Sequence, residues 1–211
     1  MTDKTDITDL PTAMFRALRA MDDECPEGLC NYVSMGPWRG KQGKEEASMT
    51  WGLTRALNQT GLWRVPDREQ AYPGGGGRCD RVVQLADASW LWLEIKRAWR
   101  AWYFGHLKRN PHQIYRGYLS GSHHTHSFAG DFHKLERIGP EHGRYLGLLL
   151  IGFDLDDAEM QRDVAAVMRN ERVADRGWQS ATAAWQTAQC SECWIRCWFC
   201  WRETLVASPA R

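Results

Sequence analysis

The residue types best suited to chemistry in this sequence lie in a segment with the pattern of a β-hairpin. Residues 82–85 and 90–96 are predicted to form two strands, because the second alternates apolar with other residues and polar turn residues separate the two. Glu94 and Lys96 are two positions apart, so their side chains leave the same face of the second strand. Asp80 precedes the first strand, at the open end of the hairpin. The hairpin is therefore predicted to gather two carboxylates and an ammonium group.

The register of the hairpin decides how close these groups come. A turn centred between residues 87 and 88 places Asp80 opposite Ile95. Asp80 is then a diagonal neighbour of both Glu94 and Lys96.

Converging carboxylates repel one another unless a cation neutralises them, and oxygen ligands of this kind select Mg²⁺ or Mn²⁺. Such a cation acidifies water, and a neighbouring lysine can steer the proton of that water or face a phosphate oxygen. The constellation therefore predicts attack on a phosphodiester. The alternative is a salt bridge of Glu94 with Lys96 or Arg97 on a solvated strand face.

A third carboxylate is expected from a helix ahead of the hairpin, at about residues 44–58. Its apolar stripe consists of Met49, Leu53, Ala56 and Leu57. Glu46 lies on the edge of that stripe, whereas Glu45 lies further round the helix. Glu46 is therefore the candidate that could join the hairpin acids, with Glu45 as its substitute.

The spacing of Asp80, thirteen further residues and then Glu94-Ile95-Lys96 resembles the motif of the PD-(D/E)xK nuclease superfamily. The resemblance covers about residues 41–201 and implies a restriction endonuclease-like αβββαβ core. It also implies that Asp80 and Glu94 bind Mg²⁺ (or Mn²⁺) and that Lys96 is the catalytic lysine. The helix acid of the family falls on Glu46, which the resemblance makes a further catalytic and metal-binding residue.

Two positions depart from the patterns of that superfamily. Cys79 stands before Asp80, where the family name has proline. The helicase-associated branch carries Gln-x₃-Tyr after the lysine, but here Gln113 is followed by Gly117 and only then by Tyr118. Gln113 is kept as an accessory candidate of the site.

The remaining pattern predicts an α+β fold with a mixed central sheet flanked by helices. Residues 1–40 are predicted to form an N-terminal helix (9–23) and a loop, and residues 41–211 the nuclease-like domain. A His-rich, aromatic and basic insertion follows the second strand at about residues 98–140, with short helices near 111–119 and 131–138. After it we expect a buried strand at 144–153, a helix from 156 or 157 to 170, an ambiguous stretch at 173–189 and a last strand at 193–201.

Basic residues interleaved with aromatic ones follow Lys96 and favour a nucleic-acid substrate. The candidate phosphate contacts are Arg97, Arg100, Lys108 and Arg109, and the aromatic residues among them are Trp99, Trp102, Tyr103 and Phe104. The alternative is a solvated helix face with buried tryptophans. The expected partner is DNA, with RNA left open.

Two further clusters have the residue types of metal ligands. Cys190, Cys193, Cys197 and Cys200 have the spacing C-x₂-C-x₃-C-x₂-C, which suits zinc or an iron–sulfur cluster. A strand over this segment would instead point Cys193 and Cys197 to one face and Cys200 to the other, which favours buried core cysteines. The histidines of the SHHTHS segment, at positions 123, 124 and 126, are interpreted as a polar loop.

Composition limits the classes of protein to which the chain can belong. The formal charge of the 211 residues is +1, so any attraction to nucleic acid must be local. The longest apolar run, Leu146–Phe153, has 8 residues, far fewer than the ~20 that span a bilayer, so no membrane association is expected. Seven cysteines without an export signal favour a cytoplasmic protein with reduced thiols. The oligomeric state stays open between a monomer and a homodimer.

These observations together predict a Mg²⁺-dependent deoxyribonuclease, more specifically an endonuclease. Two alternatives remain. One is a catalytically inactive nucleic-acid-binding or scaffold module with the same fold, and the other is an interaction domain stabilised by a Cys₄ metal site.

Overall fold

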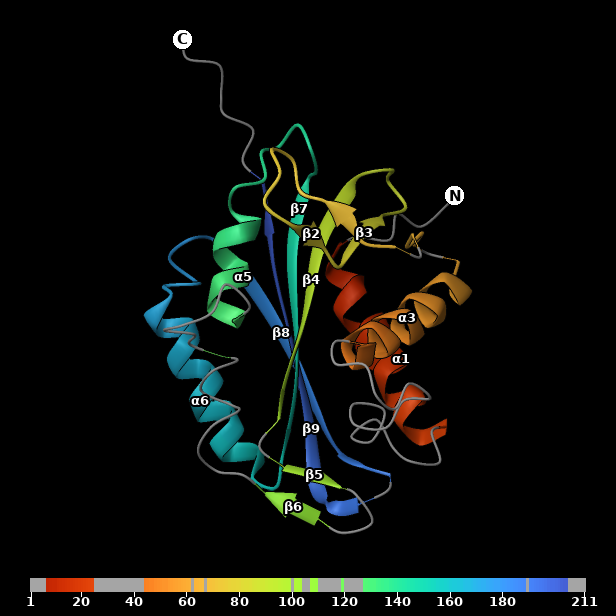
Figure 1. Cartoon of the computed structure of the whole chain (residues 1–211), viewed down its shortest axis with the longest axis vertical. Coiled ribbons are helices and arrows are strands. Elements are labelled where there is room, and N and C mark those ends of the chain that lie inside the picture. The colour runs from red at the N-terminus through yellow and green to blue at the C-terminus, as the bar shows by residue number, and fades with distance from the viewer. Residues whose placement is uncertain are drawn as a thin grey trace.

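A mixed five-stranded sheet runs through the middle of the molecule, in the order β3–β4–β7–β9–β8 (Figure 1). The computed structural model describes residues 7–24, 44–61, 63–66, 68–99, 101–103, 107–109, 119, 127–188 and 190–204. The strands of this sheet are Arg81–Gln84 (β3), Trp90–Trp99 (β4), Tyr145–Asp154 (β7), Gln179–Thr187 (β8) and Cys190–Glu203 (β9). β4 and β7 are parallel, and the other neighbours pair antiparallel.

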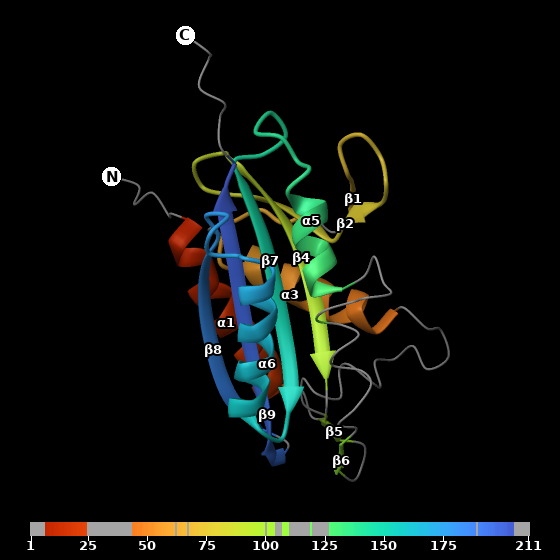
Figure 2. The same cartoon turned by 90° about the vertical axis from the view of Figure 1, so that its left-hand side faces the viewer.

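Helices cover both faces of this sheet. The α-helices of the described residues are Leu10–Glu24 (α1), Lys44–Gln59 (α3), Phe128–Leu135 (α5) and Asp157–Asn170 (α6), and a 3₁₀ turn, η1 (Ile7–Asp9), precedes α1. Figure 1 shows the sheet edge-on with α1 and α3 on one side and α5 and α6 on the other, and Figure 2 shows α5 and α6 in front of the strands. The predicted α+β class with a helix-flanked mixed sheet is confirmed.

The predicted apolar stripes are the faces by which α1 and α3 pack on the sheet. Leu10, Met14 and Leu18 of α1 are fully buried, and Met49, Leu53 and Leu57 of α3 are at most 1% exposed. All six belong to one apolar cluster that also contains strand residues of the sheet. The helices predicted at 9–23 and 44–58 are therefore confirmed to within one residue at each end.

Strand β4 separates two apolar clusters. Leu91, Leu93 and Ile95 pack in the cluster with α1 and α3, whereas Trp92 and Ala98 pack in the cluster with α5 and α6. Alternation along the strand puts Glu94 and Lys96 on the side of Trp92 and Ala98. The hairpin therefore presents its charged residues toward α5 and α6, as its alternation predicts.

The apolar run at Leu146–Phe153 forms the centre of β7, which is buried at all ten positions. A strand buried on both faces has no need of polar alternation, which explains the continuous run. In the described part of the chain no helix is both long and apolar enough to cross a membrane.

Two elements, the strand β8 and the helix α5, differ in detail from expectation. The ambiguous stretch contains the edge strand β8, which pairs antiparallel with β9. The helix predicted near 131–138 begins earlier, at Phe128, because the Ser127 hydroxyl accepts a hydrogen bond from the amide of Gly130 (3.0 Å) and caps it. Phe128 and Phe132 are fully buried, so α5 packs directly on the sheet. The helix predicted near 111–119 lies outside the described residues except for Leu119.

Two small sheets complete the described structure. β1 (Gln70–Ala71) pairs with β2 (Arg78–Cys79) just before β3, and β5 (Ala101–Tyr103) pairs with β6 (Leu107–Arg109) just after β4. Each is antiparallel, so each is a small hairpin at one end of the β3–β4 unit.

Candidate active site

The β3–β4 hairpin has a register one position away from the predicted one. Arg81 pairs with Leu93 and Gln84 with Trp90, so the turn is centred on Asp87 rather than between residues 87 and 88. The Asp87 carboxylate accepts a hydrogen bond from the Ser89 amide (2.9 Å) and fixes this centre. The predicted pairing of Asp80 with Ile95 is therefore wrong. Continuing the register by one residue sets Asp80 level with Glu94, on the same face.

Asp80 is held at the bend between β2 and β3. Its Oδ2 accepts a hydrogen bond from the amide of Ile95 (2.7 Å), and its own carbonyl accepts one from Arg81 Nη1 (2.5 Å). The thiol of Cys79 donates to the carbonyl of Leu93 (3.2 Å) and is fully buried, which ties β2 to β4. Cysteine at this position thus anchors the segment that carries Asp80.

Glu94 is 4% exposed and is contacted by a residue that sequence reasoning did not select. The Tyr72 hydroxyl donates a hydrogen bond to Glu94 Oε1, and the Tyr72 ring stacks on Trp92 at a centroid distance of 5.9 Å. Burial raises the pKa of Tyr72, so the hydroxyl stays protonated and remains a donor.

Tyr72 reaches Glu94 because the YPGGGG segment, residues 72–77, is a hairpin loop. The segment closes the β1–β2 pair, and the amide of Tyr72 donates to the carbonyl of Gly77 (3.2 Å). The glycines at positions 74–77 all have positive φ, between 78° and 128°, a backbone region that favours glycine. The glycine run therefore allows the tight return that brings Tyr72 over β4.

The two hairpin carboxyls perturb each other. Burial is the main cause that raises the pKa of Glu94 to about 9, and the negative charges of Asp80 and Asp131 add to it. Burial also raises the pKa of Asp80, although the hydrogen bond from the Ile95 amide opposes this. Two carboxylates at this place are therefore unfavourable unless a proton or a cation neutralises them.

Lys96 is paired with a carboxylate that sequence reasoning missed. Its Nζ lies 3.2 Å from Oδ2 of Asp131 in α5, whose Oδ1 lies 2.6 Å from Nζ of Lys134. Asp131 is completely buried, and the side chain of Lys96 is only 10% exposed. A detectable signal existed, because Asp131 is a lone acid between Phe128 and Leu135 on the apolar face of its helix.

The alternative that put Glu94 and Lys96 on a solvated strand face is wrong. Glu94 and Lys96 are 4% and 8% exposed, which is a buried environment. Lys96 makes an ion pair with Asp131 of α5. Arg97 is 6% exposed and, by alternation, belongs to the opposite face of β4.

Asp80 and Glu94 form a donor set that suits a hard divalent cation. Mg²⁺ is commonly held by one or two carboxylates, while water and substrate phosphates complete its octahedral shell. The mutual repulsion that raises the pKa of Glu94 is what a divalent cation at these oxygens would relieve. Over the described ranges, no three His, Cys, Asp or Glu side chains are grouped as a metal site.

A third ligand was expected from the helix that precedes the hairpin. Glu45 and Glu46 belong to the first turn of α3, but their side chains lie outside the described residues. The part of α3 that follows is tied to the site, because Arg81 Nε donates to the Thr54 hydroxyl (2.8 Å) and Arg81 also contacts the carbonyl of Asp80. The helix that carries the two glutamates is therefore fixed against the hairpin.

Most of the other residues predicted to contact nucleic acid or to assist the site lie outside the described residues. Arg100 and Gln113 are among the residues that are not described. Lys108 and Arg109 belong to β6, but their side chains are not described. The histidines at 123, 124 and 126 also lie outside the described residues.

The cysteines of the C-terminal segment are divided by strand β9 as predicted. Cys193 and Cys197 pack in the cluster with α1 and α3, whereas Cys200 packs in the cluster with α5 and α6. Burial raises the pKa of the thiols of Cys197 and Cys200, which keeps them protonated. Cys190 is half-buried at the start of the strand. Thiols on opposite faces of one sheet cannot bind one tetrahedral metal ion together.

Comparison with known proteins adds no relative: no protein-family model, curated protein or solved structure matches the chain. The interpretation of the site therefore depends on its own geometry and chemistry.

The buried contact of Asp131 with two lysines leads to a prediction about stability. Asp131→Asn is expected to lower the free energy of unfolding by about 1–3 kcal/mol, because it removes the counter-charge of a buried ammonium group. Urea unfolding followed by circular dichroism measures this. Asp175→Asn, which alters an exposed Asp paired with Arg172, is the matched control and should leave the midpoint unchanged. Equal midpoints for Asp131→Asn and wild type would contradict the assigned contact.

Proposed function

We propose that the protein is a divalent-metal-dependent nuclease that hydrolyses phosphodiester bonds in DNA, acting as an endonuclease with Mg²⁺ or Mn²⁺. The observation that carries the proposal is a pair of neighbouring carboxyls, the half-buried Asp80 and the buried Glu94, with the ammonium group of Lys96 two residues further on the same strand face. Buried charges cost stability, and groups with strongly perturbed pKa values concentrate at functional sites. A purely structural role gives no reason to keep two repelling carboxyls there.

Each residue of the site has a distinct part in this proposal. Asp80 and Glu94 would hold the cation, and the Ile95 amide and the Tyr72 hydroxyl orient their oxygens. The bound cation would supply a Lewis acid for the phosphate and the attacking water. Lys96 would steer the proton of that water and stabilise the negative charge that develops on the phosphate. Glu46 of α3 is the proposed further metal ligand.

The order of elements supports a restriction endonuclease-like core. α3, β3, β4, β7 and α6 follow one another in the αβββα order of that core, with α5 added between β4 and β7. The acid and lysine positions of the resemblance fall on β4 and on the bend before β3. In this proposal β9 would be the final strand of the core, and the edge strand β8 precedes it in the chain.

A Cys₄ interaction domain is the less favoured function. Its four thiols would have to meet at one ion, but β9 sends Cys200 to the face opposite Cys193 and Cys197. We therefore do not propose a zinc or iron–sulfur site.

Incubation of the purified protein with nucleic acids tests the proposal directly. We expect cleavage of plasmid and of single-stranded DNA with Mg²⁺ or Mn²⁺ and none with EDTA, with RNA included as a third substrate. A closed circular plasmid has no ends, so its conversion to a nicked circle or a linear molecule would show internal cleavage. Attack at ends would degrade only linear DNA. Binding of DNA without cleavage under every metal condition would contradict the proposal and favour a catalytically inactive binding module.

A further inference from the structure

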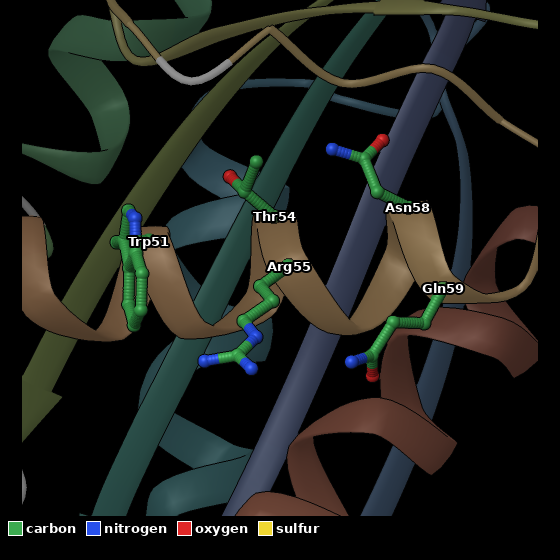
Figure 3. A pocket seen from close by; sticks show the side chains of 5 residues that line it. All are labelled: Trp51, Thr54, Arg55, Asn58 and Gln59. Atoms are coloured by element: carbon green, nitrogen blue, oxygen red, sulfur yellow. The ribbon is translucent and has the colours of Figure 1, made fainter.

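A hollow of about 410 Å³ lies on the outer side of α3, away from the packed stripe of that helix. Figure 3 shows the five side chains that line it, which are Trp51, Thr54, Arg55, Asn58 and Gln59. Trp51 is 46% exposed, and Trp90 (39%) is the other large apolar side chain exposed in the described part of the chain. Single apolar side chains are often exposed on protein surfaces, so Trp51 points to a ligand because a hollow and a cation adjoin its ring.

The chemistry around Trp51 suits a planar ligand attached to an anionic backbone. The guanidinium carbon of Arg55 lies 5.7 Å from the centroid of the Trp51 ring, so a cation accompanies the aromatic surface. None of the five lining side chains is acidic. Asn58 is fixed by two hydrogen bonds with the backbone of Val65 (2.7 and 2.8 Å), which gives the hollow a rigid end.

The side chain of Arg81 links the wall of the hollow to the backbone of Asp80. The hydroxyl of Thr54, in its wall, accepts a hydrogen bond from Arg81 Nε (2.8 Å). Nη1 of the same guanidinium contacts the carbonyl of Asp80 (2.5 Å). The wall of the hollow is therefore fixed relative to the backbone of Asp80.

We propose that this hollow is a subsite for an unpaired nucleobase of single-stranded DNA, which stacks on Trp51 while Arg55 contacts the neighbouring phosphate. This inference rests on the proposed nuclease function and adds to it a preference for substrates that contain unpaired bases. A base inside a duplex is covered by its neighbours on both faces, whereas a base in a single strand offers a free face to an indole ring. Aromatic stacking of this kind tolerates any base sequence.

Binding of a labelled oligonucleotide in EDTA, where the proposed metal-dependent cleavage does not proceed, tests the subsite. Fluorescence anisotropy with a 15-nucleotide oligo(dT) is expected to show that Trp51→Ala weakens binding about tenfold or more, whereas Trp51→Phe keeps most of the affinity. Trp90→Ala removes the other exposed tryptophan and serves as the matched control with unchanged affinity. Thermal unfolding of each variant verifies the fold.

Several outcomes would overturn the subsite. One is wild-type affinity in Trp51→Ala. Another is an equal loss for a duplex of the same length, which would show that unpaired bases are not what Trp51 recognises. Self-association that Trp51→Ala abolishes, with oligonucleotide binding unchanged, would assign the hollow to a second copy of the chain.

The result is separable from the proposed function. Metal-dependent cleavage with full oligonucleotide affinity in Trp51→Ala would overturn only the subsite. Binding that depends on Trp51, without cleavage in Mg²⁺ or Mn²⁺, would overturn only the nuclease.

Discussion

Replacing Lys96 by methionine is expected to lower the rate of DNA cleavage about 100-fold or more while the fold is retained. General acid–base and electrostatic contributions of single groups at such sites have this size. Methionine keeps an unbranched apolar stem in the same buried place, so the loss is confined to the ammonium group. Asp131 keeps Lys134 at 2.6 Å as its counter-charge, which limits the effect on stability. Single-turnover cleavage of labelled DNA with Mg²⁺, with circular dichroism of both proteins, measures the change.

Lys134→Met is the matched control for this experiment. Lys134 contacts the same carboxylate as Lys96, but its side chain is 27% exposed and it belongs to α5 rather than to the strand of Glu94. We expect cleavage by Lys134→Met to remain close to that of the wild type. Full activity of Lys96→Met, or an equal loss in both variants, would contradict the role proposed for Lys96.

Glu94→Gln is expected to abolish cleavage and, in the absence of metal, to make the protein more stable at alkaline pH. The pKa of Glu94 is raised from 4.5 to about 9 in the folded protein, so folding retains a proton that the unfolded chain releases. The stability due to this group is fully present below about pH 4.5 and is lost as the pH rises through about 9. A neutral amide removes this dependence, and its carbonyl oxygen can still accept the hydrogen bond of Tyr72. We expect a gain on the order of 1–3 kcal/mol at pH 8.5.

Urea unfolding at pH 5.5 and 8.5, with and without Mg²⁺ or Mn²⁺, measures this effect. The divalent ion should stabilise the wild type and should have little effect on Glu94→Gln, because one of the two carboxylates is lost. Glu203→Gln alters an exposed glutamate that pairs with Arg144 (2.8 Å), so it controls for the general effect of removing an acid. A variant at position 94 that is less stable than the wild type at pH 8.5 and still responds to the metal would overturn the assignment of Glu94.

Local periodicity was sufficient to predict the elements and the faces of the hairpin. The two-residue alternation of β4 separates Glu94 and Lys96 from Leu93 and Ile95, because successive side chains of a strand leave opposite faces. The helix predicted to begin at 156 or 157 starts at Asp157, since the Asp156 carboxylate accepts a hydrogen bond from the Glu159 amide (2.9 Å). These features depend on residues within a few positions of one another.

The register of the hairpin was missed by one position for a local reason of another kind. Alternation does not determine where a turn is centred, and here the carboxylate of Asp87 and its bond to Ser89 determine it. The shift sets Asp80 level with Glu94 instead of Ile95. The structure therefore brings the two carboxyls closer than the predicted register did.

By itself the sequence determined that Asp80, Glu94 and Lys96 belong to one hairpin, and that α3 and β7 pack on the core through their apolar residues. Only the tertiary structure decided which distant groups meet them. Tyr72 reaches Glu94 from 22 positions away and Asp131 reaches Lys96 from another layer of the fold. The reason is physical, because such contacts depend on how a glycine-rich loop turns back and on which face of the sheet a helix covers. No short-range pattern of residues encodes either of these.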